Sequence, residues 1–242
     1  MRLLIALSLA LGLAPLSAPA MKILDMQIVC PVDGKSFSAR VAVSGTSFGR
    51  YFDGQEFGPI ASPGPLPVCP DNGFVVGEKR EYSEAELARL RAFVASPDYR
   101  RWAAEDTPYY RLAKQQAYFG ASQDEVAQIL LAATWEAGAR RYPRYAEQAL
   151  AAWQQRAARE AGSDRAYHSR MLVGELQRRL GRFDDARASF EALRADAGFP
   201  GKQVEAEDAA YLRKIVEAQL KLIRDRSVAH ARLDENGEIV DF

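Results

Sequence analysis

The chain has 242 residues, with 32 lysine and arginine residues against 32 aspartate and glutamate residues. This balance argues against a nucleic-acid partner, because nucleic-acid-binding proteins normally carry a basic excess. The length fits one large domain or two small ones, and beyond the N-terminal segment no apolar run is long enough to span a membrane.

The first 20 residues have the pattern of a secretory signal. Arg2 supplies a positive charge, residues 3–13 are almost all apolar, and residues 18–20 form a small-x-small cleavage sequence. The apolar run is shorter than the roughly 20 residues that a membrane-spanning helix needs. We therefore predict a periplasmic or secreted protein with cleavage after Ala20. The alternative is that translation starts at Met21 and the upstream stretch is never made.

Cysteine is scarce in the rest of the chain. Removing residues 1–20 takes away one arginine and leaves 31 basic against 32 acidic residues, a net charge of −1. Cys30 and Cys69 are the only cysteines. In an oxidising compartment, an isolated pair of cysteines favours one disulfide.

Residues 21–82 have the sequence pattern of short strands and loops. Apolar and polar residues alternate over 37–43, which predicts a half-buried strand. Residues 45–66 hold five glycines and three prolines, which is typical of an extended loop. We expect the four aromatic residues of this loop to pack it onto the body of the protein; a ligand site formed by them is the alternative.

The two cysteines stand in similar five-residue segments. Residues 30–34 read Cys-Pro-Val-Asp-Gly, and residues 69–73 read Cys-Pro-Asp-Asn-Gly. A Cys-Pro-x-x-Gly turn repeated on two short strands is the outline of a zinc ribbon.

From residue 83 the chain becomes helical. Ser83 and Ser122 are each followed three residues later by glutamate, which predicts capping boxes at two helix starts. Pro108 opens a further helix that Gly120 ends. Later helices are expected over 165–180, 184–194 and 202–226. The predicted fold is therefore mainly α, with a signal at 1–20, a small β-rich module at 21–82, a helical-hairpin array at 83–228 and a tail at 229–242.

One hairpin has a recognisable pattern. Residues 174–186 read Gly-Glu-Leu-Gln-Arg-Arg-Leu-Gly-Arg-Phe-Asp-Asp-Ala and lead into Phe190 and Leu193. This resembles a tetratricopeptide repeat, in which glycine lets two helices approach, and Phe183, Ala186 and Phe190 pack between them. The match covers about 30 residues, and the flanking hairpins match only in period, so we expect a short, degenerate array.

The chain without its signal also resembles an uncharacterised bacterial family, domain of unknown function number 2225. Its members open with two Cys-Pro-x-Cys-Gly knuckles and end in a tetratricopeptide-like body. The match runs from Cys30 through residues 65–74 to the Leu-Gly-Arg-Phe sequence at 180–183. Asp33 and Asn72 stand where the family has the second cysteine of each knuckle.

This departure from the family pattern bears on metal binding. Four thiolates make a closed structural zinc site, whereas Cys30, Asp33, Cys69 and Asn72 make a poor one. In a zinc ribbon the two first-position sulfurs lie close together. The resemblance therefore implies that Cys30 and Cys69 are placed to form a disulfide, with zinc on the four-residue set as the alternative.

No catalytic constellation is evident. His168 and His230 are 62 residues apart in the sequence, and phosphate-binding loops, nucleophile elbows and zinc-protease helices are missing from it. Cys30 with Asp33, or Asp53 with Glu56, could be drawn as an acid–base pair. Carboxylates are common in glycine-rich loops, however, so neither pair indicates catalysis.

These observations favour an exported adaptor that presents a short helical-repeat surface to a protein or peptide. By its place in the repeat, the first helix of the 165–194 hairpin would bind the partner through His168, Met171, Glu175, Arg178 and Arg179. Two arginines suit an acidic segment or a chain terminus, because guanidinium binds carboxylates in a fork. A solvated helix face is the alternative for these residues. For the whole protein, the alternative is a metal- or redox-handling module at 21–82, with the helices as scaffold. The sequence leaves the oligomeric state open.

Overall fold

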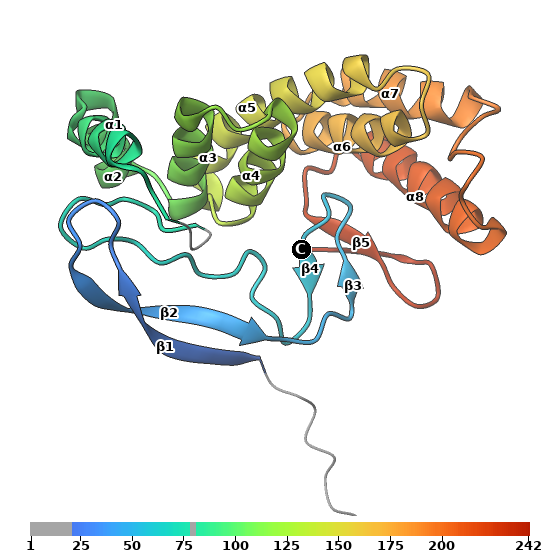
Figure 1. Ribbon diagram of the computed structural model, residues 1–242. Coiled ribbons are helices and arrows are strands. Elements are labelled where there is room, and N and C mark those ends of the chain that lie inside the picture. Colours follow the sequence, from blue (N-terminus) through green and yellow to red (C-terminus); the bar gives the residue numbers. More distant parts are fainter. Residues whose placement is uncertain (1–20, 78–80) are drawn as a thin grey trace, which may run out of the picture.

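The computed structural model describes residues 21–77 and 81–242, so the predicted signal at 1–20 lies outside the described residues. The described part is mainly α, with an array of helices after a small β-rich part, and this confirms the predicted fold class (Figure 1). The helices are α1 (Glu84–Ala95), α2 (Pro97–Glu105), α3 (Pro108–Phe119), α4 (Gln123–Trp135), α5 (Gly138–Arg159), α6 (Arg165–Arg179), α7 (Phe183–Ala195) and α8 (Ala206–Arg224).

Local signals set the helix starts as predicted. Ser83 and Ser122 each accept a hydrogen bond from the backbone N–H three residues later, and the glutamate at that position returns the bond. Ser96 ends α1 and also caps α2, whose first residue is Pro97. Pro97 cannot continue α1, but its fixed φ makes it a good first residue for α2. Because one short segment both ends α1 and begins α2, α2 is not predicted from the sequence as a separate helix.

From α3 onward, each helix packs against the next one along the chain. Trp153, Tyr145 and Leu176 are fully buried in the core that α3 to α6 share. A Cβ atom at Gly174 would lie 2.6 Å from the ring of Phe190, so the glycine is what lets α6 and α7 approach. This contact is the one that the resemblance to a tetratricopeptide repeat implies.

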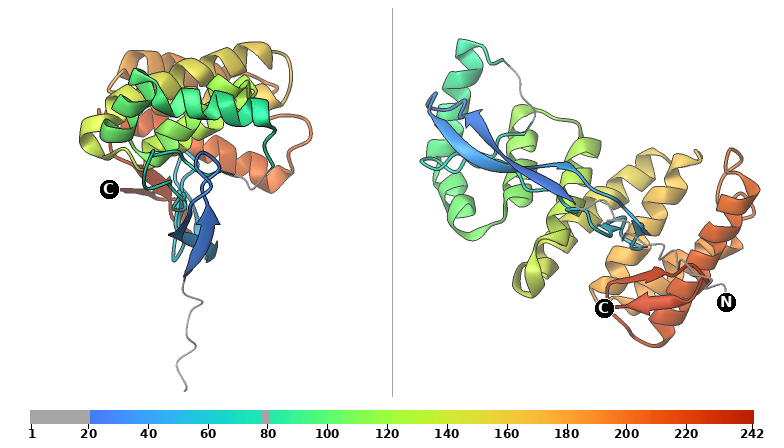
Figure 2. Two further views of the ribbon diagram at one scale, coloured as in Figure 1. Left: turned by 60° about the vertical axis from the view of Figure 1, so that its left-hand side comes forward. Right: turned by 90° about the horizontal axis from the view of Figure 1, so that it is seen from below.

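The strands of the described residues form three antiparallel pairs. β1 (Lys22–Val29) pairs with β2 (Ser36–Ser44), β3 (Gly49–Arg50) with β4 (Glu56–Phe57), and β5 (Ala231–Leu233) with β6 (Ile239–Asp241). The last pair lies in the region expected to be a plain tail. The strands lie on one side of the helical array, and residues 58–77 run between the β1–β2 hairpin and helices α3 and α4 (Figures 1 and 2).

Among the helices of residues 21–77 and 81–242, none is long and apolar enough to cross a lipid bilayer.

Candidate functional site

A disulfide joins the two cysteine turns of the β-rich part where they pack against the α1–α2 end of the array. Cys30 and Cys69 are bonded to each other with their Cα atoms 5.6 Å apart, which confirms the predicted pairing. Both sulfurs are buried against an apolar cluster that includes Leu90, Phe93 and Tyr99.

The two cysteine turns have the same backbone geometry. In the first, Cys30 N–H donates to the carbonyl oxygen five residues later, and Gly34 N–H donates to Cys30 O. Cys69 and Gly73 repeat both bonds in the second turn. The two glycines have φ values of 74° and 72°, in the left-handed region that other residues rarely adopt.

Asp33 and Asn72 use their side chains within and between these turns. Each side-chain Oδ1 accepts a hydrogen bond from the backbone N–H two residues later. Asn72 Nδ2 also donates to Asp33 Oδ2 at 3.2 Å. The four residues of the alternative metal set are thus close together, but their two sulfurs are bonded to each other and provide no thiolate. Over the described residues, no group of three or more histidine, cysteine, aspartate or glutamate side chains could hold a metal ion.

The centre of the predicted partner-binding face of α6 is buried. Glu175 and Arg178 are fully buried. Arg178 donates to both carboxylate oxygens of Glu175, to Gln219 of α8, and to the carbonyl oxygens of Ser227 and Ala229. The prediction that these two side chains bind a partner is therefore wrong. α8 and the chain that follows it pack over this face, where Gln219, Ser227 and Ala229 accept hydrogen bonds from the guanidinium.

Arg179 does bind a carboxylate, but the carboxylate belongs to the same chain. Its Nη1 donates to Asp53 Oδ2 at 2.7 Å, and His230 Nε2 lies 3.0 Å from Asp53 Oδ1. The ring of Tyr51 stacks on His230 at a centroid distance of 3.7 Å. Residues near the start and the end of the chain therefore meet on α6.

Asp53 is buried and remains ionised. Burial by itself would raise the pKa of Asp53, but the hydrogen bond to His230 and the electrostatic interactions with His230 and Arg179 outweigh it. The pKa of Asp53 therefore lies below its usual value. Sequence reasoning missed this cluster because 177 residues separate His230 from Asp53; the one available signal was a carboxylate in a loop rich in aromatic residues.

The other two predicted contact residues lie apart from each other. His168 is exposed, and its ring meets Trp153 edge to face at 5.6 Å. Met171 is partly buried against the apolar cluster of α7 and α8. The five predicted residues therefore do not form one accessible surface.

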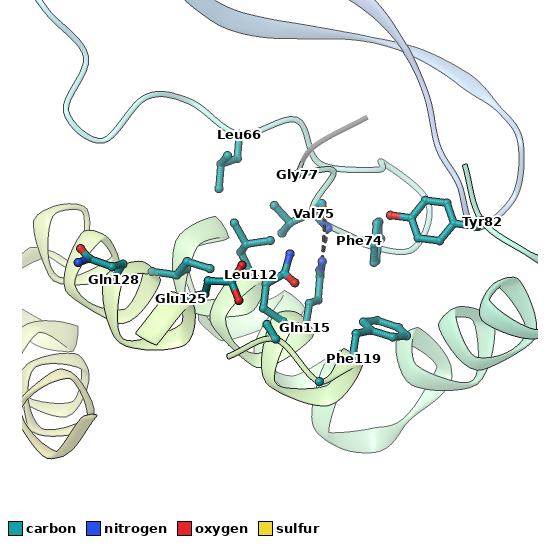
Figure 3. A pocket seen from close by; sticks show the side chains of 14 residues that line it. Leu66, Phe74, Val75, Gly77, Tyr82, Leu112, Gln115, Phe119, Glu125 and Gln128 are labelled. Carbon is teal, nitrogen blue, oxygen red and sulfur yellow. Dashed lines mark hydrogen bonds between the residues drawn. The ribbon is translucent and has the colours of Figure 1, made fainter. Parts of the chain in front are cut away.

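An open groove lies elsewhere, between residues 66–77 and helices α3 and α4 (Figure 3). Its volume is about 720 Å³. Apolar side chains make up most of its wall, with amide and carboxylate groups among them. The lining residues named in Figure 3 are Leu66, Phe74, Val75, Gly77, Tyr82, Leu112, Gln115, Phe119, Glu125 and Gln128.

Gln115 holds one wall of the groove in place. Its Oε1 accepts the N–H of Val75 and its Nε2 donates to the carbonyl oxygen of Val75, both at 2.9 Å. The hydroxyl of Tyr99 donates to the same Oε1 at 2.7 Å. A buried amide side chain of α3 thus gives an extended segment the two bonds that a neighbouring strand would give.

Two more amide side chains reach the groove. Gln116 and Gln128 line it, and neither side chain has a hydrogen-bonding partner within the described part of the chain. Leu112 and Phe119 of α3 face the groove, while Tyr110 and Ala113 of the same helix are buried in the core of the array. A helix with two apolar faces is the sequence signal for this groove.

No protein-family model matches the chain, and no curated protein or solved structure is significantly similar to it. The resemblance to the family with the two cysteine knuckles therefore stays a prediction.

Proposed function

We propose that the protein is an exported interaction adaptor that binds an extended, apolar segment of a partner protein in the groove beside α3 and α4. The observation that carries this proposal is Gln115, which binds both backbone groups of Val75 on the wall of the groove. The same helix face therefore already holds one extended segment. Gln116 and Gln128 offer the same chemistry to a second one.

The composition of the wall supports an apolar ligand. Burying apolar surface stabilises a complex by about 25 cal/mol for each Å² removed from water, and Leu66, Leu112 and Phe119 supply such surface. Amide side chains donate and accept at once, so they suit the backbone of a peptide whatever its sequence. The apolar side chains select the residues, and the amides hold the chain.

The disulfide supports an oxidising compartment outside the cytoplasm, which fits the proposed export. The N-terminal sequence of the protein purified from a bacterial host tests this directly. We expect it to begin at Met21. Full-length protein that accumulates in the cytosol with Met1 attached would contradict export.

The binding proposal is tested by selecting peptides from a random library on the immobilised protein and measuring their affinity by calorimetry. Leu66→Asp places a charge in the apolar wall and is expected to weaken binding at least tenfold. Gln128→Ala removes one amide and is expected to weaken binding by roughly fivefold, the equivalent of about 1 kcal/mol. Gln154→Ala removes an exposed amide of α5 that does not line the groove, and it should have no effect.

Failure to select any peptide, or equal affinity for the wild type and Leu66→Asp, would contradict the proposal. The alternative of a metal-handling module at 21–82 requires the disulfide to be reduced before any metal can bind. Zinc content after mild reduction, measured on the same preparation, tests it.

A further inference from the structure

The β1–β2 hairpin projects from the helical array with little to cover it (Figure 2). Four of the nine exposed large apolar side chains of the described residues lie on it: Leu24 is 40% exposed, Met26 42%, Val29 60% and Val43 45%. A two-stranded hairpin is marginally stable in water by itself. The hairpin is therefore the main uncovered apolar surface of the described chain.

One face of the hairpin is wholly apolar along its central pairs. Leu24, Met26 and Ile28 of β1 lie opposite residues 41, 39 and 37 of β2. Side chains directly opposite each other in a sheet share a face. This face therefore carries Leu24, Met26, Ile28, Phe37, Ala39 and Val41.

The outer edge of β1 has free backbone groups. Cys30 N–H donates to Lys35 O, so Cys30 directs its backbone groups toward β2. Hydrogen-bonded and non-hydrogen-bonded pairs alternate in an antiparallel ladder, and the even-numbered residues of β1 therefore bond to β2. The odd-numbered residues Ile23, Asp25, Gln27 and Val29 direct N–H and C=O outward. β1 is the strand on the side away from the helices (Figure 1).

We propose that a second copy of this chain pairs with β1 along this edge, antiparallel, about a two-fold axis that passes beside Met26. The two hairpins would then form one four-stranded sheet. With this axis, Asp25 bonds to Gln27 of the second copy and Ile23 bonds to Val29 of the second copy. These are the residues whose backbone N–H and C=O groups point outward, so a two-fold axis at this position pairs the free groups of one copy with those of the other.

The side chains fit the same arrangement. Met26 meets Met26 of the second copy, and Leu24 meets Ile28 of the second copy, at the non-hydrogen-bonded positions where side chains approach most closely. The apolar face becomes four strands wide. Asp25 faces an amide, so no like charges oppose each other across the interface. Val29, the most exposed of the four apolar residues, receives a partner in Ile23 of the second copy.

Light scattering coupled to gel filtration, over a range of protein concentrations, tests the proposal on protein purified from the periplasm of a bacterial host. We expect the wild type to show twice the mass of one chain. Met26→Lys and Met26→Asp each place two like charges on the axis, and each alone should give a monomer. An equimolar mixture of the two variants should restore the doubled mass, because opposite charges then meet.

Two further variants keep the test decisive. Val43→Lys alters an equally exposed residue of β2 outside this edge and should leave the dimer unchanged. Gln27→Pro removes an outward N–H without touching the bonds to β2, and it should abolish the dimer even if a Met26 variant does not fold. Folding is checked by the circular dichroism of the helices and by the intact disulfide. A wild type that is monomeric up to its solubility limit overturns the proposal, as does a dimer that survives both Met26→Lys and Gln27→Pro.

Discussion

The β-rich segments are attached to the helical array at two ends, and the two attachments differ in kind. At the α1–α2 end, a buried disulfide and the apolar side chains of Leu90, Phe93 and Tyr99 hold the cysteine turns. At the α6–α8 end, an ionised Asp53 binds Arg179 and His230. The first attachment is apolar packing of two turns that the disulfide holds together, and only that disulfide depends on the redox state of its surroundings; the second attachment is ionic and depends on pH. Each can therefore be loosened while the other stays intact.

A buried hydrogen-bond network centred on Arg178 lies beneath the ionic attachment. Arg178 holds the carbonyl oxygens of Ser227 and Ala229, just before His230 in the chain. Glu175 and Gln219 complete the network, and Gln219 Nε2 donates to Glu175 Oε2 at 2.8 Å. Because removing one partner of a buried ion pair leaves the other charge uncompensated, this end should be the more sensitive of the two to single substitutions.

Arg178→Ala should therefore have the largest effect. The substitution leaves the buried carboxylate of Glu175 without its cation and two backbone carbonyl oxygens without a donor. We expect a loss toward the upper end of roughly 3–5 kcal/mol in the free energy of unfolding, measured by urea denaturation. Arg187→Ala removes an exposed arginine that pairs with Asp184, and it should change stability by less than about 0.5 kcal/mol. Equal stability of the two variants would show that the buried network is not what holds this end.

The disulfide should have the next largest effect. Its two cysteines are 39 residues apart in the sequence, and closing a loop of this size stabilises a fold by about 4 kcal/mol in the chain-entropy model. The Cys30→Ala, Cys69→Ala variant is expected to lose about that amount. Hydrogen exchange should quicken first around α1 and α2 and last around Asp53. Uniform quickening along the whole chain would show that the two ends are not independent.

The sequence predicted the disulfide of the first attachment and no part of the second, for physical reasons. Two matching Cys-Pro-x-x-Gly segments are a local signal, and cysteine chemistry leaves few options for an isolated pair. Local signals also predicted the starts of α1, α3 and α4, through two capping boxes and a proline at a first position. The contact between Asp53 and Arg179 joins residues 126 apart, and no short-range pattern encodes it.

The same limit explains the error on α6. An arginine pair at the end of a helix has the same sequence whether it faces solvent or a later helix. The packing of α8 and the tail decides between the two, and it buries Arg178 while it leaves Arg179 for Asp53. Sequence analysis thus identified the binding chemistry of Arg179, a carboxylate, but assigned it to a separate molecule.

Asp53→Asn should loosen the ionic end alone, and in a pH-dependent way. The pKa of Asp53 is lowered in the folded state, so its contribution to stability is complete above the unfolded-state pKa of about 3.9 and is lost as the pH falls through the folded-state pKa. We expect the variant to be less stable than the wild type by about 2–3 kcal/mol at pH 7, because two charge-assisted hydrogen bonds weaken. The difference should shrink steadily below about pH 4.

Thermal unfolding of both proteins between pH 7 and pH 3 measures this difference. Asp184→Asn, at an exposed position, controls for the loss of one charge. A difference between Asp53→Asn and the wild type that stays constant down to pH 3 would contradict the role of the ionised carboxylate.

Gln115→Leu should have the smallest effect on the free energy of unfolding. It leaves the disulfide and the Asp53 cluster intact, and these still hold the segment that contains residues 58–77 at its two ends. The leucine fills a similar volume but leaves the N–H and C=O of Val75 without their partner. Each unpaired buried group costs about 1–3 kcal/mol, and access to the adjoining groove lets water recover part of this cost. We therefore expect a loss of about 1–2 kcal/mol in total, with faster hydrogen exchange of the Val75 amide as the specific readout.

Gln116→Leu is the matched control: it makes the same change one residue along α3, where the side chain has no partner among the described residues. If Val75 exchanges equally fast in both variants, Gln115 does not hold the segment, and the observation behind the proposed peptide groove is removed as well.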